Sequence, residues 1–372
     1  MNGSFRVIDA DRHIIEPADL WDRYLDGPFR GRVTADGERR LVDGRPVMAA
    51  PAGHPLDQKL AASRQDLYKE VFADAVTSGF DAASNVRDMD REGVDVAVHF
   101  PSTGLHIMWL DGMDPQLSTA ICRAYNNWIA DFCSYDPVRL KGIGVVALHD
   151  VALAVEEIRR AVRELGLVGV TLRPNPLDGK ILSDPSRSPI YETLSDLGIP
   201  LLIHGAERTF LPQPGAAHYT GFSSHIASHP LDQMLACLTF CADGVLERFP
   251  DLTVGFMEAG CGWVPFWLER MDEHWEHPLR GRTRRTKELP SAYFEAQAFV
   301  SCEAGEELIG CVVEHLGDAN LVMATDYPHP DAVGKFPDRT VGDLVRDKSI
   351  TDATKHRILW ENPARLYHLT DA

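Results

Sequence analysis

The sequence lacks two features of membrane and nucleic-acid-binding proteins. No stretch of about 18 residues is apolar and free of charge, so we expect no membrane-spanning helix. Positive charge is also scarce, because 37 Lys and Arg residues are outnumbered by 55 Asp and Glu residues, giving a formal net charge of −18. An acidic surface of this kind repels phosphate backbones and anionic lipid heads. We therefore expect neither a nucleic-acid partner nor a membrane partner.

Several catalytic motifs are absent as well. The 372 residues contain no phosphate-binding loop, no Gly-x-Ser-x-Gly turn and no His-Glu-x-x-His helix. The 7 cysteines include no Cys-x-x-Cys pair, and their apolar surroundings predict reduced core thiols. The first residues lack the apolar segment of a secretion signal. These absences predict a cytoplasmic protein whose chemistry uses other side chains.

What is present is a globular composition, 44% hydrophobic and 25% charged, with a regular alternation of strands and helices. Apolar segments of strand length occur at residues 7–13, 94–101, 141–148, 168–174, 200–205, 252–260, 299–303 and 320–326. Segments with helical periodicity lie between them, at 82–92, 152–165, 189–197, 231–249 and 306–316. This alternation is typical of a (β/α)8 TIM barrel in the α/β class. We predict that residues 1–372 form one such domain.

Two stretches interrupt the alternation. Residues 27–79 follow the first predicted strand and residues 207–230 follow the fifth, and both stretches are rich in Gly and Pro. Segments that follow the carboxyl ends of barrel strands build the active sites of barrel enzymes. We therefore predict that the two insertions form lids or walls of a substrate pocket. A last helix is expected near residues 352–367.

Charged and imidazole side chains occur where the predicted strands end. Asp11 and His13 share one face of the first strand, because alternate residues of a strand point the same way. His204, Glu258 and Asp326 end the fifth, sixth and eighth strands. Because these ends meet at one mouth of a barrel, we expect the five side chains to lie close together.

This arrangement predicts a metal site with four ligands: Asp11, His13, His204 and Asp326. Imidazole nitrogens and carboxylate oxygens suit a divalent cation that keeps one position open for water or substrate. Taken singly, His204 could be a hydrogen-bonded core histidine and Asp326 a carboxylate that caps a turn. Their joint position at the strand ends favours the metal site.

These residues lie within motifs that resemble the amidohydrolase superfamily. The similarity is to the branch that includes aminocarboxymuconate-semialdehyde decarboxylase and the resorcylate and vanillate-type decarboxylases. It covers most of the chain and rests on the segments DRHIIEP (11–17), the strand ending at His204, FPDL (249–252), EAGCGWVP (258–265), TDYPHPD (325–331) and ENPARLY (361–367). By this resemblance, Asp11 and His13 match the ligand pair of the first strand. His204 matches the ligand of the fifth strand and Asp326 the carboxylate of the eighth.

The chain departs from the family at three positions. Many relatives carry histidine or glutamate in place of Asp11, which still permits ligation of a metal. Superfamily hydrolases with two metals use a carboxylated lysine after the fourth strand, where this chain has Arg173, so we expect one divalent metal, Zn²⁺ or alternatively Mn²⁺. The characterised decarboxylases have a proton-transferring histidine at the end of the sixth strand, where this chain has Glu258. A carboxyl group beside a metal can act as acid, base or ligand. We predict that Glu258 controls catalysis, together with Asp326 and His229, without being essential for metal loading.

Three further residues are candidates for substrate binding: Arg173, His225 and His329. Arg173 can clamp a substrate carboxylate with two hydrogen bonds, or instead pair with Glu258 or a loop acid. His225 and His229 belong to the loop expected after the fifth strand, and the alternative for each is a surface histidine. His329 follows Asp326 closely enough to orient a ligand or donate to the substrate.

The resemblance and the site residues leave three functions open. The first is a metal-dependent enzyme that removes CO₂ from a small unsaturated or aromatic carboxylic acid. The second is a metal-dependent hydrolase of an amide, a lactone or a carbon–carbon bond. The third is a barrel that binds a ligand without catalysis, and the intact set of predicted metal ligands argues against it.

A homodimer is also expected. Relatives are commonly dimers, and the segment 263–275 carries four aromatic residues of the kind enriched at interfaces: Trp263, Phe266, Trp267 and Trp275. The alternative is that these rings pack against the barrel of their own chain.

Overall fold

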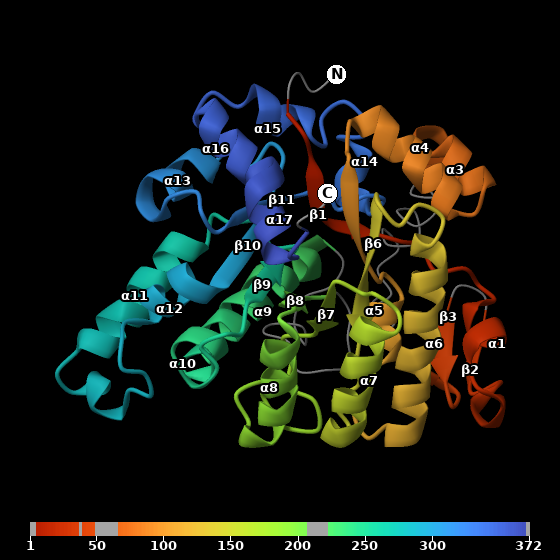
Figure 1. Ribbon diagram of the computed structural model, residues 1–372, viewed down its shortest axis with the longest axis horizontal. Helices are drawn as coiled ribbons and strands as arrows, with labels where there is room; N and C mark the ends of the chain where they lie inside the picture. Colours follow the sequence, from red (N-terminus) through yellow and green to blue (C-terminus); the bar gives the residue numbers. More distant parts are fainter. Residues whose placement is uncertain (1–4, 37–38, 49–65, 207–221, 370–372) are drawn as a thin grey trace.

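Eight parallel strands form the centre of the protein (Figure 1). The computed structural model describes residues 5–36, 39–48, 66–206 and 222–369. In sheet order the strands are β1 (Ile8–His13), β5 (Val96–Phe100), β6 (Leu140–Val145), β7 (Gly169–Leu172), β8 (Leu201–His204), β9 (Val254–Met257), β10 (Ala298–Glu303) and β11 (Leu321–Ala324). The predicted barrel is confirmed, and each predicted strand is present with ends shifted by a few residues.

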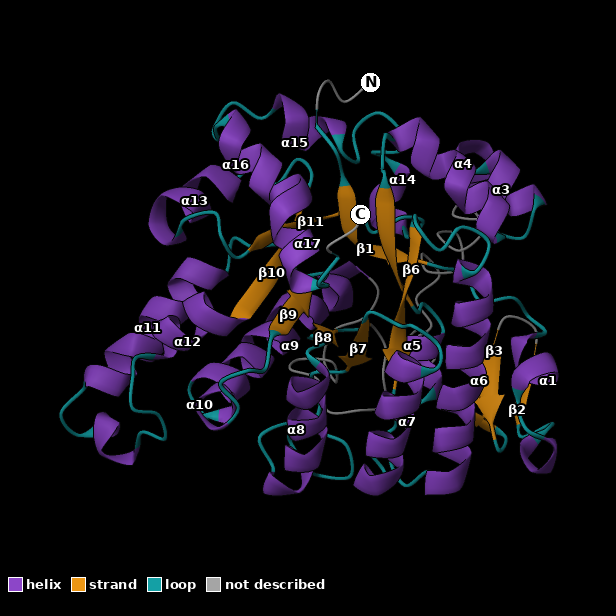
Figure 2. Ribbon diagram, viewed as in Figure 1, coloured by secondary structure: helices purple, strands orange, loops and turns teal. Residues whose placement is uncertain are grey.

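Helices follow the strands and cover the outside of the barrel (Figure 2). The longer ones are α4 (Ala82–Glu92), α6 (Pro115–Cys133), α7 (Val151–Arg163), α8 (Ser188–Leu197), α9 (Phe222–Cys241), α11 (Val264–Glu276), α12 (Pro290–Gln297) and α13 (Ile309–Leu316). Local sequence fixes their ends. In α4, the Asp81 carboxylate accepts from the Ser84 N–H at 2.8 Å, and Gly93 ends the helix in the left-handed conformation.

The barrel interior is filled by side chains from alternate strand positions and by the end of the chain. A buried cluster combines strand residues such as Leu202 and Met257 with Leu366 and Tyr367. These last two residues lie at the end of α17 (Asn362–Leu366), whose neighbours are α16 (Asp352–His356) and the π-helical η4 (Arg357–Glu361). Gly255 is needed here, because a Cβ at this position would lie 2.6 Å from Leu202 Cδ1. The interior is therefore a packed core and not a channel.

The first insertion contains a small sheet. Its strands are β2 (Val33–Asp36), β3 (Arg39–Val42) and β4 (Arg45–Pro46), paired antiparallel and placed beside α1 (Leu20–Tyr24) and α6 in Figure 1. Short helices complete the described part of the chain: η1 (Gly27–Phe29), α3 (Ala73–Thr77), α5 (Gly104–Ile107), η2 (Pro185–Arg187), α10 (Val245–Arg248), η3 (Arg280–Thr283), α14 (Pro330–Val333) and α15 (Gly342–Arg346). Within the described residues, no helix combines the length and the apolar character that crossing a bilayer requires.

Two predictions about the second half of the chain need correction. The helix expected at 231–249 begins at Phe222 and ends at Cys241, and Gly244, in the left-handed conformation, precedes the separate helix α10. The loop expected at 207–230 is therefore helical from residue 222 onward, so His225 and His229 lie on α9. Residues 207–221 of this insertion lie outside the described residues.

Candidate metal centre

The candidate metal centre lies at the carboxyl ends of four strands. Asp11 and His13 belong to the end of β1, and His204 is the last residue of β8. Glu258 follows β9 directly, and Asp326 lies two residues beyond β11. Both histidine side chains are fully buried, and the side chain of Glu258 is only 11% exposed. The structure thus brings together the five side chains that the sequence placed at strand ends.

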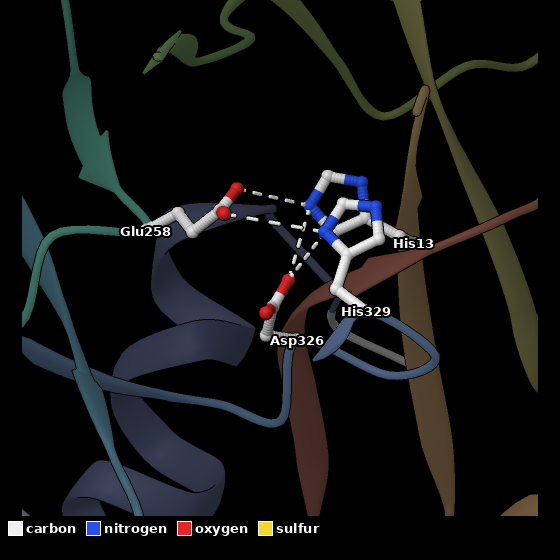
Figure 3. A group of neighbouring side chains, drawn as sticks. All are labelled: His13, Glu258, Asp326 and His329. Carbon is white, nitrogen blue, oxygen red and sulfur yellow. Dashed lines mark ion pairs between the residues drawn. The ribbon is translucent and has the colours of Figure 1, made fainter. Parts of the chain in front are cut away.

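Two histidine nitrogens and one carboxylate oxygen meet in the middle of this centre. His13 Nε2 lies 3.1 Å from His204 Nε2, and Glu258 Oε2 lies 2.8 Å from His204 Nε2 and 3.3 Å from His13 Nε2. Asp11 Oδ1 and Asp326 Oδ1 approach His13 Nε2 to 3.7 Å and 3.6 Å. Figure 3 shows Glu258 and Asp326 pointing toward His13. Donor atoms thus converge from β1, β8, β9 and β11.

The outer nitrogen of each buried imidazole faces a backbone carbonyl. His13 Nδ1 lies 2.9 Å from the Pro101 oxygen, and His204 Nδ1 lies 2.7 Å from the Gly205 oxygen. A carbonyl only accepts, so each Nδ1 carries a proton, and a neutral ring presents a lone pair on Nε2. Burial lowers the pKa of His13 to about 3, which keeps that ring neutral. Burial also opposes the charged form of His204, but Glu258 and Asp11 outweigh it and raise the pKa of this ring, so a cation bound here would replace the proton on His204 Nε2.

The carboxyl groups of Asp11 and Asp326 accept no hydrogen bond within the described residues. Neither oxygen of Asp11 accepts a hydrogen bond within the described part of the chain, although the residue is only 1% exposed. Burial raises the pKa of Asp11 and of Asp326 well above the usual range, and the charge of Glu258 adds to the effect at both. Burial alone would also raise the pKa of Glu258, but His229 and His204 outweigh it and hold this pKa well below its usual range. These residues fit a divalent cation, which would satisfy all the converging oxygens and nitrogens at once.

Both carboxylates that follow barrel strands have unusual backbone conformations. The φ angles are +52° at Glu258 and +54° at Asp326, in the left-handed region that favours glycine. Specific hydrogen bonds hold each of them: Glu258 N–H donates to Ser301 Oγ at 2.9 Å, and Asp326 N–H donates to the Asp11 oxygen at 3.2 Å. Strained residues of this kind persist where the surroundings over-determine them, commonly at functional sites.

His329 lies against the same centre. Its Nδ1 is 2.8 Å from Asp326 Oδ1, and its ring stacks on His13 at 3.8 Å between centroids (Figure 3). On the other side, His329 Nε2 lies 2.8 Å from Ser102 Oγ, which itself donates to the Ile14 oxygen at 2.7 Å. Because that hydroxyl proton is used, Ser102 accepts from Nε2–H. With Nε2 bound to Ser102, Nδ1 is the nitrogen of His329 that faces Asp326.

The two histidines of α9 differ in depth. His229 is 7% exposed, and its Nε2 lies 3.4 Å from Glu258 Oε1. Its pKa is lowered to about 4 by burial. The side chain of His225 is 45% exposed and lies 3.4 Å from Asp331 Oδ2, with 5.1 Å between the two imidazole centroids. His229 therefore reaches the centre, whereas His225 lies between it and the solvent.

Arg173 is buried at the end of β7 and joins three segments of the barrel mouth. Its Nη1 donates to the Leu105 oxygen at 3.1 Å, and its Nη2 donates to Asn175 Oδ1 at 2.7 Å and to the Ala206 oxygen at 3.2 Å. Burial lowers its pKa to about 9. No ion pair with Glu258 is recorded among the described residues, so the pairing considered from the sequence is not present there. A clamp on a substrate carboxylate would use a guanidinium that already holds these segments together.

Sequence reasoning missed the residues that hold the centre in place. Glu16 accepts from the N–H groups of Ser102, Thr103 and Gly104 at 3.0, 2.9 and 2.8 Å and so fixes the segment after β5. Ser102 then orients His329, as described above. The one available signal was that Glu16 stands inside the DRHIIEP motif; nothing in the sequence marks Ser102.

Comparison with known proteins agrees with this geometry. A sequence model of the amidohydrolase family matches residues 8–369. The chain is 27% identical over 299 residues to a 2-amino-3-carboxymuconate-6-semialdehyde decarboxylase of Dictyostelium discoideum, an alignment that covers 78% of this chain and 77% of the relative. It is 23% identical over 307 residues to a gamma-resorcylate decarboxylase of Polaromonas sp. JS666, covering 76% of this chain and 86% of the relative.

Solved structures share the fold. An amidohydrolase of Mycobacterium avium subsp. paratuberculosis superposes with a TM-score of 0.75 at 20% identity, covering 98% of both chains. A dihydroxybenzoic acid decarboxylase of Polaromonas sp. JS666, solved with bound manganese and an inhibitor, gives a TM-score of 0.67 at 17% identity, covering 99% of this chain and 98% of the other. Together with the match over nearly the whole sequence, these findings show that the chain belongs to the amidohydrolase family.

Proposed function

We propose that the protein is a metal-dependent decarboxylase that removes CO₂ from a small unsaturated or aromatic carboxylic acid without oxidising it. The observation that carries this proposal is the converging set of buried donors beside the ionised carboxylate of Glu258. The sequence relatives named above, two decarboxylases of such acids, support it. Four residues would hold the metal: Asp11, His13, His204 and Asp326. When bound, the metal supplies a Lewis acid that holds the substrate carboxylate and an adjacent oxygen.

Glu258 is the proposed proton donor. In the protein without substrate it is ionised, because His229 and His204 outweigh the effect of burial on its pKa. A substrate carboxylate brings a second negative charge, which raises the pKa of a neighbouring acid. Glu258 then takes up a proton from solvent water on Oε1, the oxygen that lies 3.4 Å from His229 Nε2. It passes this proton to the carbon that carries the substrate carboxylate; that carbon keeps the electron pair of the breaking C–C bond, and CO₂ leaves.

The remaining candidates have positioning and binding roles in this proposal. His329 would face the substrate with Nδ1, since Ser102 holds its other nitrogen. His225, 45% exposed, would line the approach to His229. Arg173 would orient the substrate carboxylate from the end of β7.

The ionised state of Glu258 also favours a second function, hydrolysis of an amide, a lactone or a carbon–carbon bond. A carboxylate that is already deprotonated can accept a proton from an attacking water. The two functions therefore differ in the direction of proton transfer at Glu258.

The products that form in heavy water distinguish decarboxylation from hydrolysis. We expect metal-loaded protein incubated with a panel of aromatic acids, amides and lactones in D₂O to release CO₂ and to leave one deuterium at the carbon that lost it. Protein treated with a chelator serves as the control and should release none. Release of a new acid without CO₂ would assign the hydrolase instead. A panel without any turnover by metal-loaded protein would favour a ligand-binding barrel.

We further propose that the metal is a single Zn²⁺ per chain, with Mn²⁺ as the alternative. Imidazole nitrogens favour Zn²⁺, whereas a larger share of carboxylate oxygens suits Mn²⁺. Elemental analysis of the purified protein should show one metal per chain and a sharp loss in His204→Ala. Two tightly held metals per chain would contradict the single site.

A homodimer is the proposed assembly. Of the four aromatic residues in the segment 263–275, Phe266 is 60% exposed, whereas Trp267 donates from Nε1 to the Met234 oxygen of α9 at 2.7 Å. Much of the segment therefore packs within its own chain, and Phe266 remains for a partner, together with Leu235 of α9, 47% exposed. Light scattering should give twice 41.3 kDa. Phe266→Asp should yield monomers, and a monomeric wild type would refute the dimer.

A further inference from the structure

Glu258 Oε2 occupies an unusual place between the two buried imidazoles. It lies 2.8 Å from His204 Nε2 and 3.3 Å from His13 Nε2, and those two nitrogens are 3.1 Å apart. Both rings use their Nδ1 proton on a backbone carbonyl. Once the proton of His204 Nε2 is released, three acceptor atoms face one another at the corners of a small triangle. A single proton can link only two of them, whereas one cation can bind all three.

The sides of this triangle match the spacing of ligands on one metal ion. Nitrogen and oxygen ligands lie roughly 2.0–2.2 Å from Zn²⁺, so two of them are about 2.8–3.6 Å apart at bond angles between octahedral and tetrahedral values. The observed separations of 2.8, 3.1 and 3.3 Å are close to this range. Asp11 Oδ2, 3.7 Å from His204 Nε2, and Asp326 Oδ1, 3.6 Å from His13 Nε2, are slightly farther out.

We infer that Glu258 Oε2 is a direct ligand of the metal while no substrate is bound. This inference rests on the proposed metal-dependent function and adds β9 to the strands that supply ligands. It also revises the expectation from the sequence that Glu258 is dispensable for metal loading. Glu258 then occupies the coordination position of the metal that we expected from the sequence to be open for water or substrate.

When a substrate arrives, the carboxylate of Glu258 can move toward the two histidines that already lie near its second oxygen. Oε1 lies 3.4 Å from His229 Nε2 and 4.0 Å from His329 Nδ1. The backbone of Glu258 is held at φ +52° by the hydrogen bond from its N–H to Ser301 Oγ, so only the side chain needs to move. A substrate carboxylate can therefore displace Oε2, and the released carboxylate stays beside the two histidines.

Metal affinity and the spectrum of bound Co²⁺ test the inference without measuring turnover. Three variants are compared with the wild type: Glu258→Gln, which removes the charge; Glu258→Asp, which keeps the charge but withdraws the oxygen by about 1.5 Å; and Glu303→Gln as a matched control. Glu303 ends the neighbouring strand β10 and pairs with Lys335 at 2.8 Å. Co²⁺ affinity is measured by competition with a chelating dye, and the visible absorption of the saturated protein reports its ligands. Circular dichroism confirms that each variant is folded.

We expect both Glu258 variants to bind Co²⁺ at least about tenfold more weakly, with a changed absorption spectrum, and Glu303→Gln to behave like the wild type. If Glu258 acts only through its charge, Glu258→Asp will keep the affinity and the spectrum of the wild type, and the inference is wrong. It is equally wrong if Glu258→Gln leaves both unchanged. A wild type that binds no divalent metal would instead overturn the proposed function itself.

Discussion

At the scale of single residues, the groups behind each side chain decide what that side chain presents to the centre. Pro101 and Gly205 carbonyls take the Nδ1 protons of His13 and His204, and the Ser102 hydroxyl takes the Nε2 proton of His329. In all three rings the remaining nitrogen faces a carboxylate or another imidazole. Tautomers fixed in this way are typical of metal-binding histidines.

The first prediction concerns the proton that Glu258 transfers. Glu258→Gln keeps the size of the side chain but cannot carry a proton, and acid–base groups contribute about 10²–10⁴-fold in rate. Turnover measured at saturating metal should therefore fall by this factor. Glu303→Gln, at the end of the next strand, should retain the activity of the wild type. Turnover of Glu258→Gln within about threefold of the wild type would assign the proton to another group.

The sequence revealed which residues end the strands but not how they are held there. Asp11, His13 and His204 could be placed because their strands are regular and apolar. The left-handed backbones of Glu258 and Asp326 could not, since L-residues rarely adopt them. The groups that accept their N–H hydrogen bonds, Ser301 Oγ and the Asp11 carbonyl, are distant in sequence.

At the scale of elements, buried side chains link the first strand of the barrel, β1, to the last strand, β11. We call this contact, formed by Asp9, Arg12 and Thr325, the joint. The sheet order begins with β1 and ends with β11, and side chains assist the backbone where these two strands meet. Asp9 accepts from the N–H of Thr325 at 3.1 Å and from its hydroxyl. Arg12 lies 3.5 Å from Asp9 Oδ2 and 2.6 Å from Glu92 Oε2 of α4, with every one of these side chains buried. The joint thus positions Asp11 and Asp326, which are neighbours of the residues that form it.

The sequence alone could not predict this joint. Strand alternation places Asp9 on the face of Asp11, but the pairing of β1 with β5 is irregular between Asp9 and Arg12. A bulge of this kind adds a residue and turns Asp9 toward Arg12. The partner Thr325 lies 316 residues away, a distance across which one sequence carries no pairing signal.

The second prediction tests the joint. Asp9→Ala removes a buried partner of Arg12 and leaves the Thr325 N–H without its acceptor, which typically costs about 3–5 kcal/mol. Urea unfolding of chelator-treated protein should show a loss of this size. The matched control is Asp90→Ala, which removes an exposed partner of Arg139 on helix α4 and should cost about 1 kcal/mol or less. Equal losses in both variants would show that Asp9 does not stabilise the joint.

At the scale of the whole molecule, buried ionisable groups have opposite effects on how the free energy of unfolding changes as the pH falls. Burial raises the pKa of Asp9, Asp11 and Glu16, so the folded chain binds their protons more readily than the unfolded chain. Stability from these carboxyls rises as the pH falls. Burial lowers the pKa of His13 and of His99, each to about 3, which has the opposite effect. Only the difference in stability between the wild type and a variant isolates the contribution of one group.

The third prediction isolates His99. This histidine of β5 points away from the metal centre, between Phe132 of α6, with 5.5 Å between ring centroids, and Asn85 of α4, whose Oδ1 is 3.3 Å from Nε2. Its pKa is about 3 in the folded protein, because burial opposes the charged ring, against an ordinary value of 6.5 in the unfolded chain. Between these values only the unfolded chain binds the proton, so the neutral ring stabilises the fold above pH 6.5 and this contribution is lost as the pH falls.

A comparison of His99→Gln with the wild type measures that contribution. The glutamine cannot titrate, so the stability advantage of the wild type should shrink by on the order of 2 kcal/mol between pH 6.5 and pH 4.5 in chelator-treated protein. Phe132→Leu, which disturbs the same packing without a titratable group, should lose the same free energy of unfolding at both pH values. A wild-type advantage over His99→Gln that stays constant with pH would show that the unfolded and folded chains bind the proton of His99 alike, and would contradict the burial of a neutral ring at this position.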